Sequence, residues 1–137
     1  MSFKTGLACT MAMLLAACGT FHPKSDQEMV TERAQQRLDA LKKRDMEAAY
    51  ALMSPGYRES NDLRYFQATI GAGARWLTDA KVKRANCDED VCSVVIEAQY
   101  RYRDKAAGPA GEPLLIPRDN EERWIKVDGD WWFMKLD

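Results

Sequence analysis

Histidine is almost absent from this chain, and so are a surplus of positive charge and a long apolar run. One histidine stands among 137 residues, 20 Lys and Arg face 21 Asp and Glu, and the formal net charge is -1. A Ser-His-Asp triad needs a histidine in the folded domain, but the only one, His22, lies in a short polar stretch near the N-terminus. Nucleic-acid-binding domains usually carry a basic surplus, so no nucleic-acid partner is expected. No cluster of residues with metal-ligand spacing stands out, and we expect no metal and no cofactor.

The apolar run that the chain does have is short and lies close to its N-terminus. Residues 5–17 are uncharged and largely apolar, follow Lys4, and end in Ala16 and Ala17. A basic start, an apolar core of about 7–15 residues and small residues at its end are typical of a secretory signal peptide. A membrane-spanning helix needs roughly 20 apolar residues. The alternative interpretation is a buried N-terminal helix.

The stretch Leu15-Ala16-Ala17-Cys18 resembles the lipobox of bacterial lipoprotein precursors. The resemblance implies cleavage before Cys18, whose thiol then carries a diacylglycerol thioether and whose new α-amino group carries an acyl chain such as palmitate. Two or more such chains anchor a protein stably to a membrane. Residue 19 is glycine rather than aspartate. In such precursors this implies export of the protein to the outer membrane, where the domain would face the periplasm.

These features divide the chain into three parts. Residues 1–17 are the predicted lipoprotein signal peptide, 18–25 hold the lipidated cysteine and a tether, and 26–137 form one domain. Seven tether residues reach at most roughly 25 Å, so the domain is expected to stay close to the bilayer.

The cysteine count agrees with export. Cys9 leaves with the signal peptide and Cys18 takes the lipid, which leaves Cys87 and Cys92 in the domain. Two thiols in an exported domain usually pair as a disulfide, and the two cysteines flank a predicted four-residue hairpin turn. Zinc is the rival interpretation, but a structural zinc site normally has four protein ligands.

Helices are predicted in the first half of the domain. Ser25 and Glu28 fit a capping box, and Asp45 can cap a second helix. The segment 54–56 is expected to end that helix, a third begins after Asn61 or Asp62, and the glycines at 71–73 are expected to stop it. An apolar stripe at helical spacing follows the capping box and comprises Val30, Ala34, Leu38 and Leu41.

Strands are predicted from Trp76 onward. Alternation places Val94, Ile96 and Ala98 on one face of a strand, and residues 114–117 are expected to form a short cover. Asp128-Gly129 between two β-type runs is a strong signal for a two-residue hairpin. Its register pairs Ile125 with Trp132 and Trp124 with Phe133.

The two faces of this last hairpin carry the predicted site residues. The face with Ile125 and Trp132 is expected to point toward the helices, and Arg123 on it could hold an anionic ligand beside Trp132. The opposite face would then expose an aromatic cluster, which is typical of a partner surface. That candidate interface comprises Trp124, Trp131 and Phe133.

The fold class that follows is α+β, with N-terminal helices packed on a curved antiparallel sheet of about four strands. The chain resembles the NTF2-like superfamily, which includes ketosteroid-isomerase-like and SnoaL-like proteins. The resemblance rests on the order of elements, on residues 42–58 (KKRDMEAAYALMSPGYR) and on residues 124–133 (WIKVDGDWWF). The resemblance covers residues 26–137 and implies a cone with a pocket between sheet and helices. Members include isomerases, dehydratases and non-catalytic binders, so the fold does not choose a function.

No residue is predicted to be catalytic. Asp39, Asp45 and Glu97 are carboxylates at plausible places, but a polar helix face, a helix cap and a polar strand face account for them. The sequence therefore favours a lipid-anchored envelope protein whose domain binds a ligand, an envelope protein or a second copy of itself. One alternative is a pocket enzyme of the ketosteroid-isomerase-like type, an isomerase or hydro-lyase, which requires an acid facing the cavity. Another is a structural accessory of an envelope assembly or secretion machine.

Overall fold

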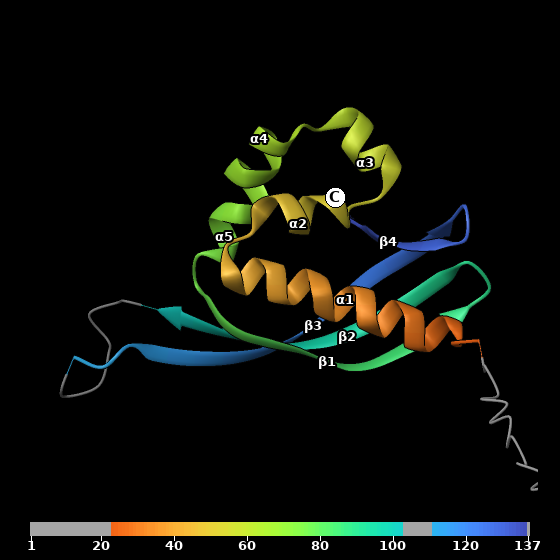
Figure 1. Ribbon diagram of the computed structural model, residues 1–137. Helices are drawn as coiled ribbons and strands as arrows, with labels where there is room; N and C mark the ends of the chain where they lie inside the picture. The colour runs from red at the N-terminus through yellow and green to blue at the C-terminus, as the bar shows by residue number, and fades with distance from the viewer. Residues whose placement is uncertain (1–22, 103–110, 137) are drawn as a thin grey trace, which may run out of the picture.

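The computed structural model describes residues 23–102 and 111–136 and places helices on one face of a four-stranded sheet (Figure 1). The helical elements are α1 (Asp26–Lys43), α2 (Met46–Ala51), α3 (Pro55–Ser60), α4 (Leu63–Phe66), the π-helical turn η1 (Gln67–Gly71) and α5 (Ala72–Ala74). The strands are β1 (Leu77–Asp88), β2 (Val91–Tyr102), β3 (Leu114–Val127) and β4 (Asp130–Met134). They form an antiparallel meander in the order β1-β2-β3-β4. The predicted α+β class is confirmed.

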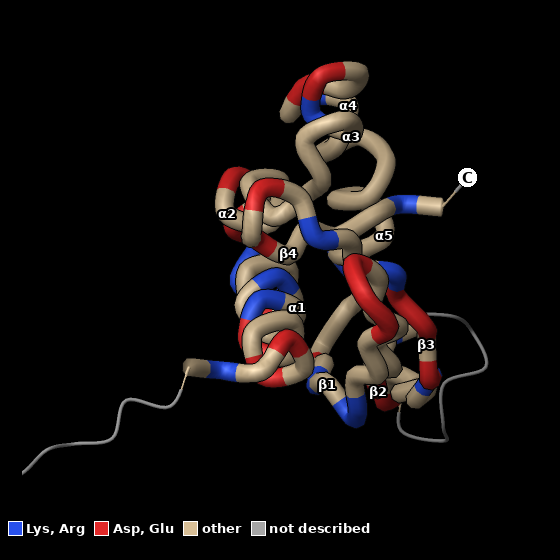
Figure 2. The backbone as a smooth tube through the Cα atoms, turned by 90° about the vertical axis from the view of Figure 1, so that its right-hand side faces the viewer, with Lys and Arg blue, Asp and Glu red and all other residues tan. Residues whose placement is uncertain are grey.

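Helix α1 begins at the predicted capping box and lies along the sheet over β1 (Figure 1). The Glu28 carboxylate accepts the Ser25 N–H at 2.8 Å, and the Ser25 hydroxyl accepts the Glu28 N–H at 3.3 Å. Two donors that a helix start leaves without partners are thereby satisfied. The predicted apolar stripe is buried, and charged residues of both signs occupy the other faces of the helix (Figure 2).

The helices after α1 differ from the prediction at two turns. The Asp45 side chain caps α2 as expected, at 3.0 Å from the Ala48 nitrogen. Residues 54–56, however, start α3 rather than only ending α2, because Ser54 is its N-cap and Pro55 suits the first helical position. The glycines at 71–73 do not stop the helical segment, which continues through η1 into α5. Gly71 instead allows close packing, since a Cβ there would lie 3.0 Å from the Met46 sulfur.

The first hairpin is tighter than predicted, and the third strand is longer. Cys87 pairs with Cys92, and the ladder continues to Asp88 and Val91, which leaves two turn residues instead of four. The predicted cover at 114–117 is wrong, because those residues are the start of β3 and pair with β2.

The last hairpin has the predicted register but the opposite orientation. Ile125 pairs with Trp132 and Trp124 with Phe133, around a turn in which Asp128 and Gly129 have φ of 53° and 84°. The face turned toward the helices is the tryptophan face, since Trp124 is 0% exposed and Trp131 1%. Paired residues of neighbouring strands share a face, and Trp124 pairs with Cys92, which belongs to the buried side of β2.

Strand β4 is held on its free side by the loop after α2. The Phe133 N–H donates to the Leu52 carbonyl and the Ser54 N–H to the Phe133 carbonyl, both at 2.9 Å. These bonds satisfy an edge strand that would otherwise expose its backbone. They also close the core at this end of the sheet.

Candidate functional site

A pocket of about 240 Å³ opens between the helices and the inner face of the sheet. Its walls come from the second half of α1, from η1 and α5, and from β1, β2 and β3. Most of the lining is apolar, and the polar side chains are few. Those polar lining residues are Arg37, Tyr100, Asn120 and Glu122.

Arg37 and Glu122 form an ion pair buried among apolar side chains. Arg37 Nη1 donates to Glu122 Oε1 at 2.7 Å, and the two side chains are 5% and 9% exposed. Removing two charges from water costs free energy that only good geometry and further hydrogen bonds offset. A second bond is present, because the Trp124 indole N–H donates to Glu122 Oε2 at 3.1 Å. Both carboxylate oxygens of Glu122 are therefore engaged.

Aromatic rings complete the surroundings of the pair. The Arg37 guanidinium carbon lies 3.7 Å from the centroid of the Phe133 ring, a distance at which a cation and a ring face attract. Phe133 in turn meets Trp124 edge to face at 5.9 Å. These contacts surround the pair at one side of the pocket, where the buried Arg37 Nε finds no hydrogen-bond partner among the described residues.

Two other polar groups of the pocket are not committed. Within residues 23–102 and 111–136, neither the Asn120 amide nor the Tyr100 hydroxyl makes a hydrogen bond to protein. Both residues are half-buried. They stand on neighbouring strands, Tyr100 opposite Ile116 and Asn120 opposite Ile96. A bound molecule that offers one carbonyl or hydroxyl group would satisfy one of them.

The residues predicted to hold a ligand do not line this pocket. Arg123 is exposed on the outer face of the sheet, where it pairs with Ser93 and Met134. Trp132 is half-buried under two other guanidinium groups, those of Arg33 at 4.6 Å and Arg58 at 5.1 Å. The prediction failed because it assigned the helix-facing side of the last hairpin to the wrong face.

The same reversal overturns the predicted exposed aromatic cluster. Trp124 and Trp131 are among the largest fully buried side chains, and Phe133 is half-buried against the core. A partner cannot reach the two tryptophans without unfolding the domain. The candidate interface formed by Trp124, Trp131 and Phe133 is therefore core in the structure.

The carboxylates weighed from the sequence also lie outside the pocket. Asp39 is bonded to Gln35 and Lys42; burial raises its pKa, but these hydrogen bonds outweigh that effect and the pKa is lowered. Asp45 is a helix cap, and Glu97 pairs with lysines on the outer face. Glu122 is the carboxylate that reaches the pocket, and sequence reasoning missed it. The sequence held an indication of this position, because Glu122 is two residues from Trp124 and therefore lies on the same face of the strand as that tryptophan.

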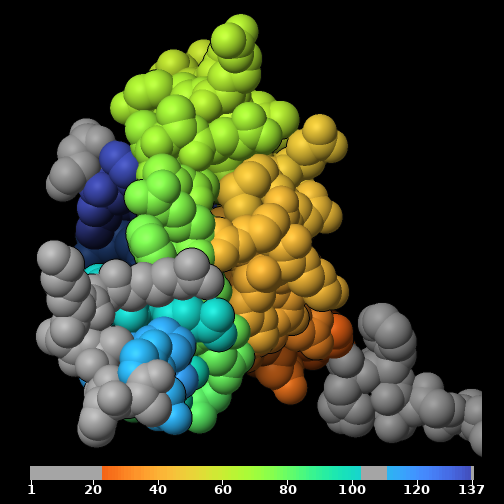
Figure 3. All heavy atoms as spheres, turned by 90° about the vertical axis from the view of Figure 1, so that its left-hand side faces the viewer, coloured from red at the N-terminus to blue at the C-terminus, as the bar shows by residue number. Residues whose placement is uncertain are grey.

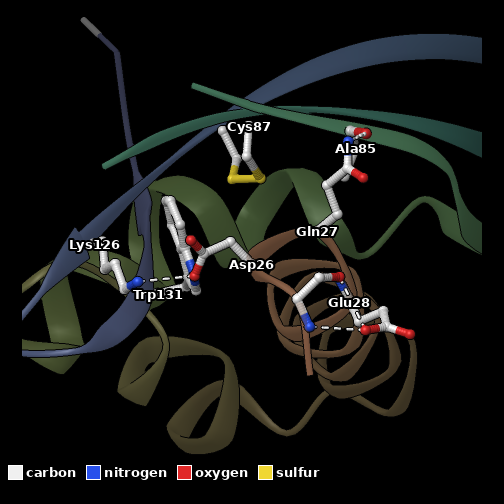
Figure 4. The surroundings of a disulfide bond; sticks show 9 residues. Asp26, Gln27, Glu28, Ala85, Cys87, Lys126 and Trp131 are labelled. Carbon is white, nitrogen blue, oxygen red and sulfur yellow. Dashed lines mark hydrogen bonds and ion pairs between the residues drawn. A yellow bond between two sulfur atoms is a disulfide. The ribbon is translucent and has the colours of Figure 1, made fainter. Parts of the chain in front are cut away.

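The two domain cysteines stand opposite each other on β1 and β2, with Cα atoms 4.0 Å apart, and the structure supports a disulfide between Cys87 and Cys92 (Figure 4). The start of α1 lies nearby, where Asp26 Oδ1 accepts Lys126 Nζ at 2.8 Å and the Trp131 indole N–H at 3.2 Å. Those two hydrogen bonds lower the pKa of Asp26. Within the described residues, no three metal-ligating side chains gather.

Cys18 and the signal-like segment before it lie outside the described residues, as does most of the tether. The described helices include none that combines the length and the apolar character needed to cross a bilayer.

Comparison with solved structures identifies the fold. The structure is similar to a SEC-C motif containing protein from Rhodopseudomonas palustris (TM-score 0.55, 15% identity, 77% of each chain covered). It is also similar to a protein from Streptomyces avermitilis described as a dehydratase of the NTF2-like family (TM-score 0.52, 9% identity, 77% of this chain and 89% of that one). A third is described as a polyketide cyclase from Xanthomonas campestris (TM-score 0.51, 9% identity, 82% and 93%).

These similarities and the helix-covered sheet establish that the domain has the NTF2-like α+β fold. Identities this low show the fold alone, and the fold hosts several activities. No protein-family model matches the sequence, and no curated protein is similar to it.

Proposed function

We propose that this chain is a lipid-anchored protein of the bacterial envelope whose NTF2-like domain binds a small neutral molecule in the pocket beside Arg37 and Glu122. The ligand is mostly apolar and carries one carbonyl or hydroxyl group. The observation that carries the proposal is the uncommitted pair of polar groups, Asn120 and Tyr100, in an otherwise apolar pocket. Pockets of this kind hold a ligand by apolar contact and orient it by a few polar groups.

The charge of the pocket argues for a neutral ligand. Arg37 and Glu122 neutralise each other at 2.7 Å, and both oxygens of Glu122 already accept hydrogen bonds. An anionic ligand would bring a second negative charge beside the buried Glu122 carboxylate, and the single charge of Arg37 would have to serve both. A ketone or alcohol brings no charge into the pocket.

The envelope location rests on the N-terminal sequence. The lipobox-like Leu15-Ala16-Ala17-Cys18 closes a signal-like run, and Gly19 follows it. A lipid on Cys18 would hold the domain at the outer membrane, facing the periplasm. Intact mass spectrometry of protein from its native host tests this part: the expected species begins at Cys18 with its acyl chains, and one that begins at Met1 without lipid would refute it.

A small ketone tests the pocket. The probe is 1-indanone, which has about ten non-hydrogen atoms, and at about 0.3 kcal/mol per atom we expect a dissociation constant in the millimolar range or tighter. Titration of the full chain should move backbone NMR signals at residues 96–100 and 120–122. Indane, which lacks the oxygen, should bind roughly 2- to 10-fold more weakly because it loses one hydrogen bond.

Two asparagines provide the matched variants. Asn120→Leu should abolish the preference for 1-indanone over indane, whereas Asn86→Leu, at an exposed position of β1, should preserve it. If 1-indanone moves no signal of the pocket, or if both variants behave alike, the proposal is wrong.

A second function is favoured by one observation, namely that Glu122 is a carboxylate lining the pocket. A ketosteroid-isomerase-like enzyme would use it as a general base to remove a proton beside a carbonyl group. The same probe decides between the two functions. Deuterium incorporation at C2 of 1-indanone in D₂O, faster than in buffer and lost in Glu122→Gln, would favour the enzyme. Binding without exchange would favour the binding module.

A further inference from the structure

Three arginines from separate parts of the chain gather around one open groove at the end of the molecule where α1 finishes and β1 starts. Arg44 is the C-cap of α1, Arg75 follows α5, and Arg101 lies near the end of β2. The groove has a volume of about 440 Å³. Its lining, here called the arginine groove, consists of Arg44, Arg75, Trp76, Leu77, Thr78 and Arg101.

Among the described residues, no carboxylate forms an ion pair with the arginine groove. Arg33, Lys42 and Lys83, by contrast, each form ion pairs. The Arg44 guanidinium donates to the Arg75 carbonyl, and Arg75 lies 4.8 Å from the Trp76 ring centroid. The first contact holds the Arg44 side chain against the segment that carries Arg75, and the second places the Arg75 guanidinium over an aromatic ring. A surface of this kind has a positive potential and presents guanidinium groups that fit phosphate.

Exposed apolar side chains collect at the same end. Arg101 donates its backbone N–H to the Trp76 carbonyl at 2.8 Å and pairs with Leu115 on β3. Figure 3 views this end of the molecule, where the end of β2 is cyan and the start of β3 is light blue. Four of the seven exposed large hydrophobic residues in the described chain lie here: Trp76, Tyr102, Leu114 and Leu115.

We propose that this end of the domain docks onto a bilayer surface rich in anionic phospholipid, with lipid phosphates in the arginine groove. Tryptophan and tyrosine favour the level of the headgroups, and clustered arginines are attracted to anionic leaflets. Trp76 and Tyr102 supply the first property and the three arginines the second. Leu77 lines both the arginine groove and the ligand pocket, so that docking would bring the pocket close to the membrane.

This contact is distinct from the lipid anchor. The 18 residues of α1 extend about 27 Å, with the tether at the first end and Arg44 at the other. The tether reaches roughly 25 Å. An anchor at Cys18 together with the arginine groove would hold α1 along the bilayer instead of leaving the domain to rotate freely on its tether.

Vesicle sedimentation of the full chain tests the proposal. The lipids are phosphatidylcholine alone and phosphatidylcholine mixed with phosphatidylglycerol, and the variant is Arg44→Gln/Arg75→Gln/Arg101→Gln. We expect at least 10-fold tighter binding to the mixed vesicles, and roughly 100-fold weaker binding to them by the triple variant. The N-terminal apolar run is the same in every protein compared and therefore does not produce the difference.

A charge-matched control removes three exposed arginines elsewhere: Arg64→Gln/Arg84→Gln/Arg123→Gln. It should retain at least half of the wild-type affinity. Replacement of the three groove arginines by lysine should also retain most of the binding, which separates loss of charge from loss of fold. Equal losses in the groove and control variants, or equal wild-type binding to both lipids, would overturn the proposal.

Two further readouts locate the contact and exclude a soluble ligand. Hydrogen exchange at residues 75–78 and 100–102 should slow with mixed vesicles and stay unchanged with phosphatidylcholine. Inorganic phosphate and glycerol phosphate should bind the full chain at least 10-fold more weakly than the mixed vesicles do. If either soluble phosphate binds as tightly as the vesicles, the arginine groove is a site for free phosphate esters and the membrane proposal fails.

Discussion

The two faces of the sheet give very different environments to two adjacent glutamates of β3, Glu121 and Glu122. Glu121 points to the outer face, is exposed, and accepts a hydrogen bond from the Ser93 hydroxyl. Glu122 points to the inner face, is 8% exposed, and is held by Arg37 and Trp124. The pleat of β3 alone separates the two environments. The same side chain is thereby a solvated surface group on one face and part of a buried pair on the other.

Ion pairs on the outer face have ordinary geometry but little expected effect on stability. Lys81 and Glu97 approach to 2.9 Å and Lys83 and Asp119 to 2.8 Å, but their side chains are 35% to 62% exposed. Exposed pairs contribute about 0–1 kcal/mol each. A buried pair costs about 3–5 kcal/mol when one partner is removed, because the other charge stays behind unpaired. Burial, and not the distance between the charges, decides how much each pair matters.

The largest effect is expected from the tryptophans of the last hairpin. Trp124→Ala should lower the free energy of unfolding by about 3–5 kcal/mol, because it empties core volume and removes the hydrogen bond to Glu122. Trp132→Ala, on the other face, should cost at most about 1.5 kcal/mol, since it loses partly exposed contacts with Arg33 and Arg58. Urea denaturation measures both. Equal costs would mean that the two faces do not differ as described.

Glu122→Gln and Glu121→Gln sharpen the comparison with matched chemistry. The first should cost about 3 kcal/mol or more because Arg37 remains buried without a counter-charge, and the second should stay within about 0.5 kcal/mol. Thermal or urea unfolding gives the two values. A small cost for Glu122→Gln would show that Arg37 finds water or another partner.

A double variant shows whether the buried pair serves stability at all. Replacing a buried pair by apolar residues is often neutral or stabilising, so Arg37→Met/Glu122→Leu should recover most of the loss caused by Glu122→Gln. It should also change the binding of 1-indanone, since both residues line the pocket. Recovery of stability together with unchanged binding of 1-indanone would show that the pair is not part of the ligand site.

The smallest effect is expected at the rim between the faces, where Asp26 joins Lys126 and Trp131. Hydrogen bonds from these two residues lower the pKa of Asp26 in the folded chain. A carboxylate whose pKa is lowered by folding stabilises the fold above its unfolded pKa, near pH 4, and loses that contribution as the pH falls through its folded pKa. The stability difference between wild type and Asp26→Asn should therefore shrink below about pH 4. A difference that stays constant from pH 7 to pH 2 would contradict this.

Local signals in the sequence predicted the elements, and long-range pairing decided what they could not. The capping box at Ser25 and the turn at Asp128-Gly129 depend on neighbouring residues, and both are as predicted. The orientation of the last hairpin depends on the pairing of Trp124 with Cys92 across more than thirty residues. Since both of its faces are apolar, hydrophobicity alone could not choose between them.

The site was missed for the same reason, although part of its signal was local. Arg37 lies seven residues after Val30, on the buried face of α1. Glu122 is two residues before Trp124 and lies on the same buried face of β3. A charge on an apolar helix face predicts a buried partner. The sequence does not identify that partner, because Glu122 is 85 residues away from Arg37 and only the fold brings the two together. Asn120 carries no local signal, because one asparagine within a polar run looks like a surface residue.

The most direct test of the account is a crystal structure of the full chain with 1-indanone bound. We expect the ketone oxygen within about 3 Å of the Asn120 side-chain amide, with the rings against Leu38, Ile96 and Ala98 and the Arg37–Glu122 pair intact. A ketone bound elsewhere, or a pocket filled by protein side chains with no room for it, would contradict the claim that this face of the sheet is a ligand site.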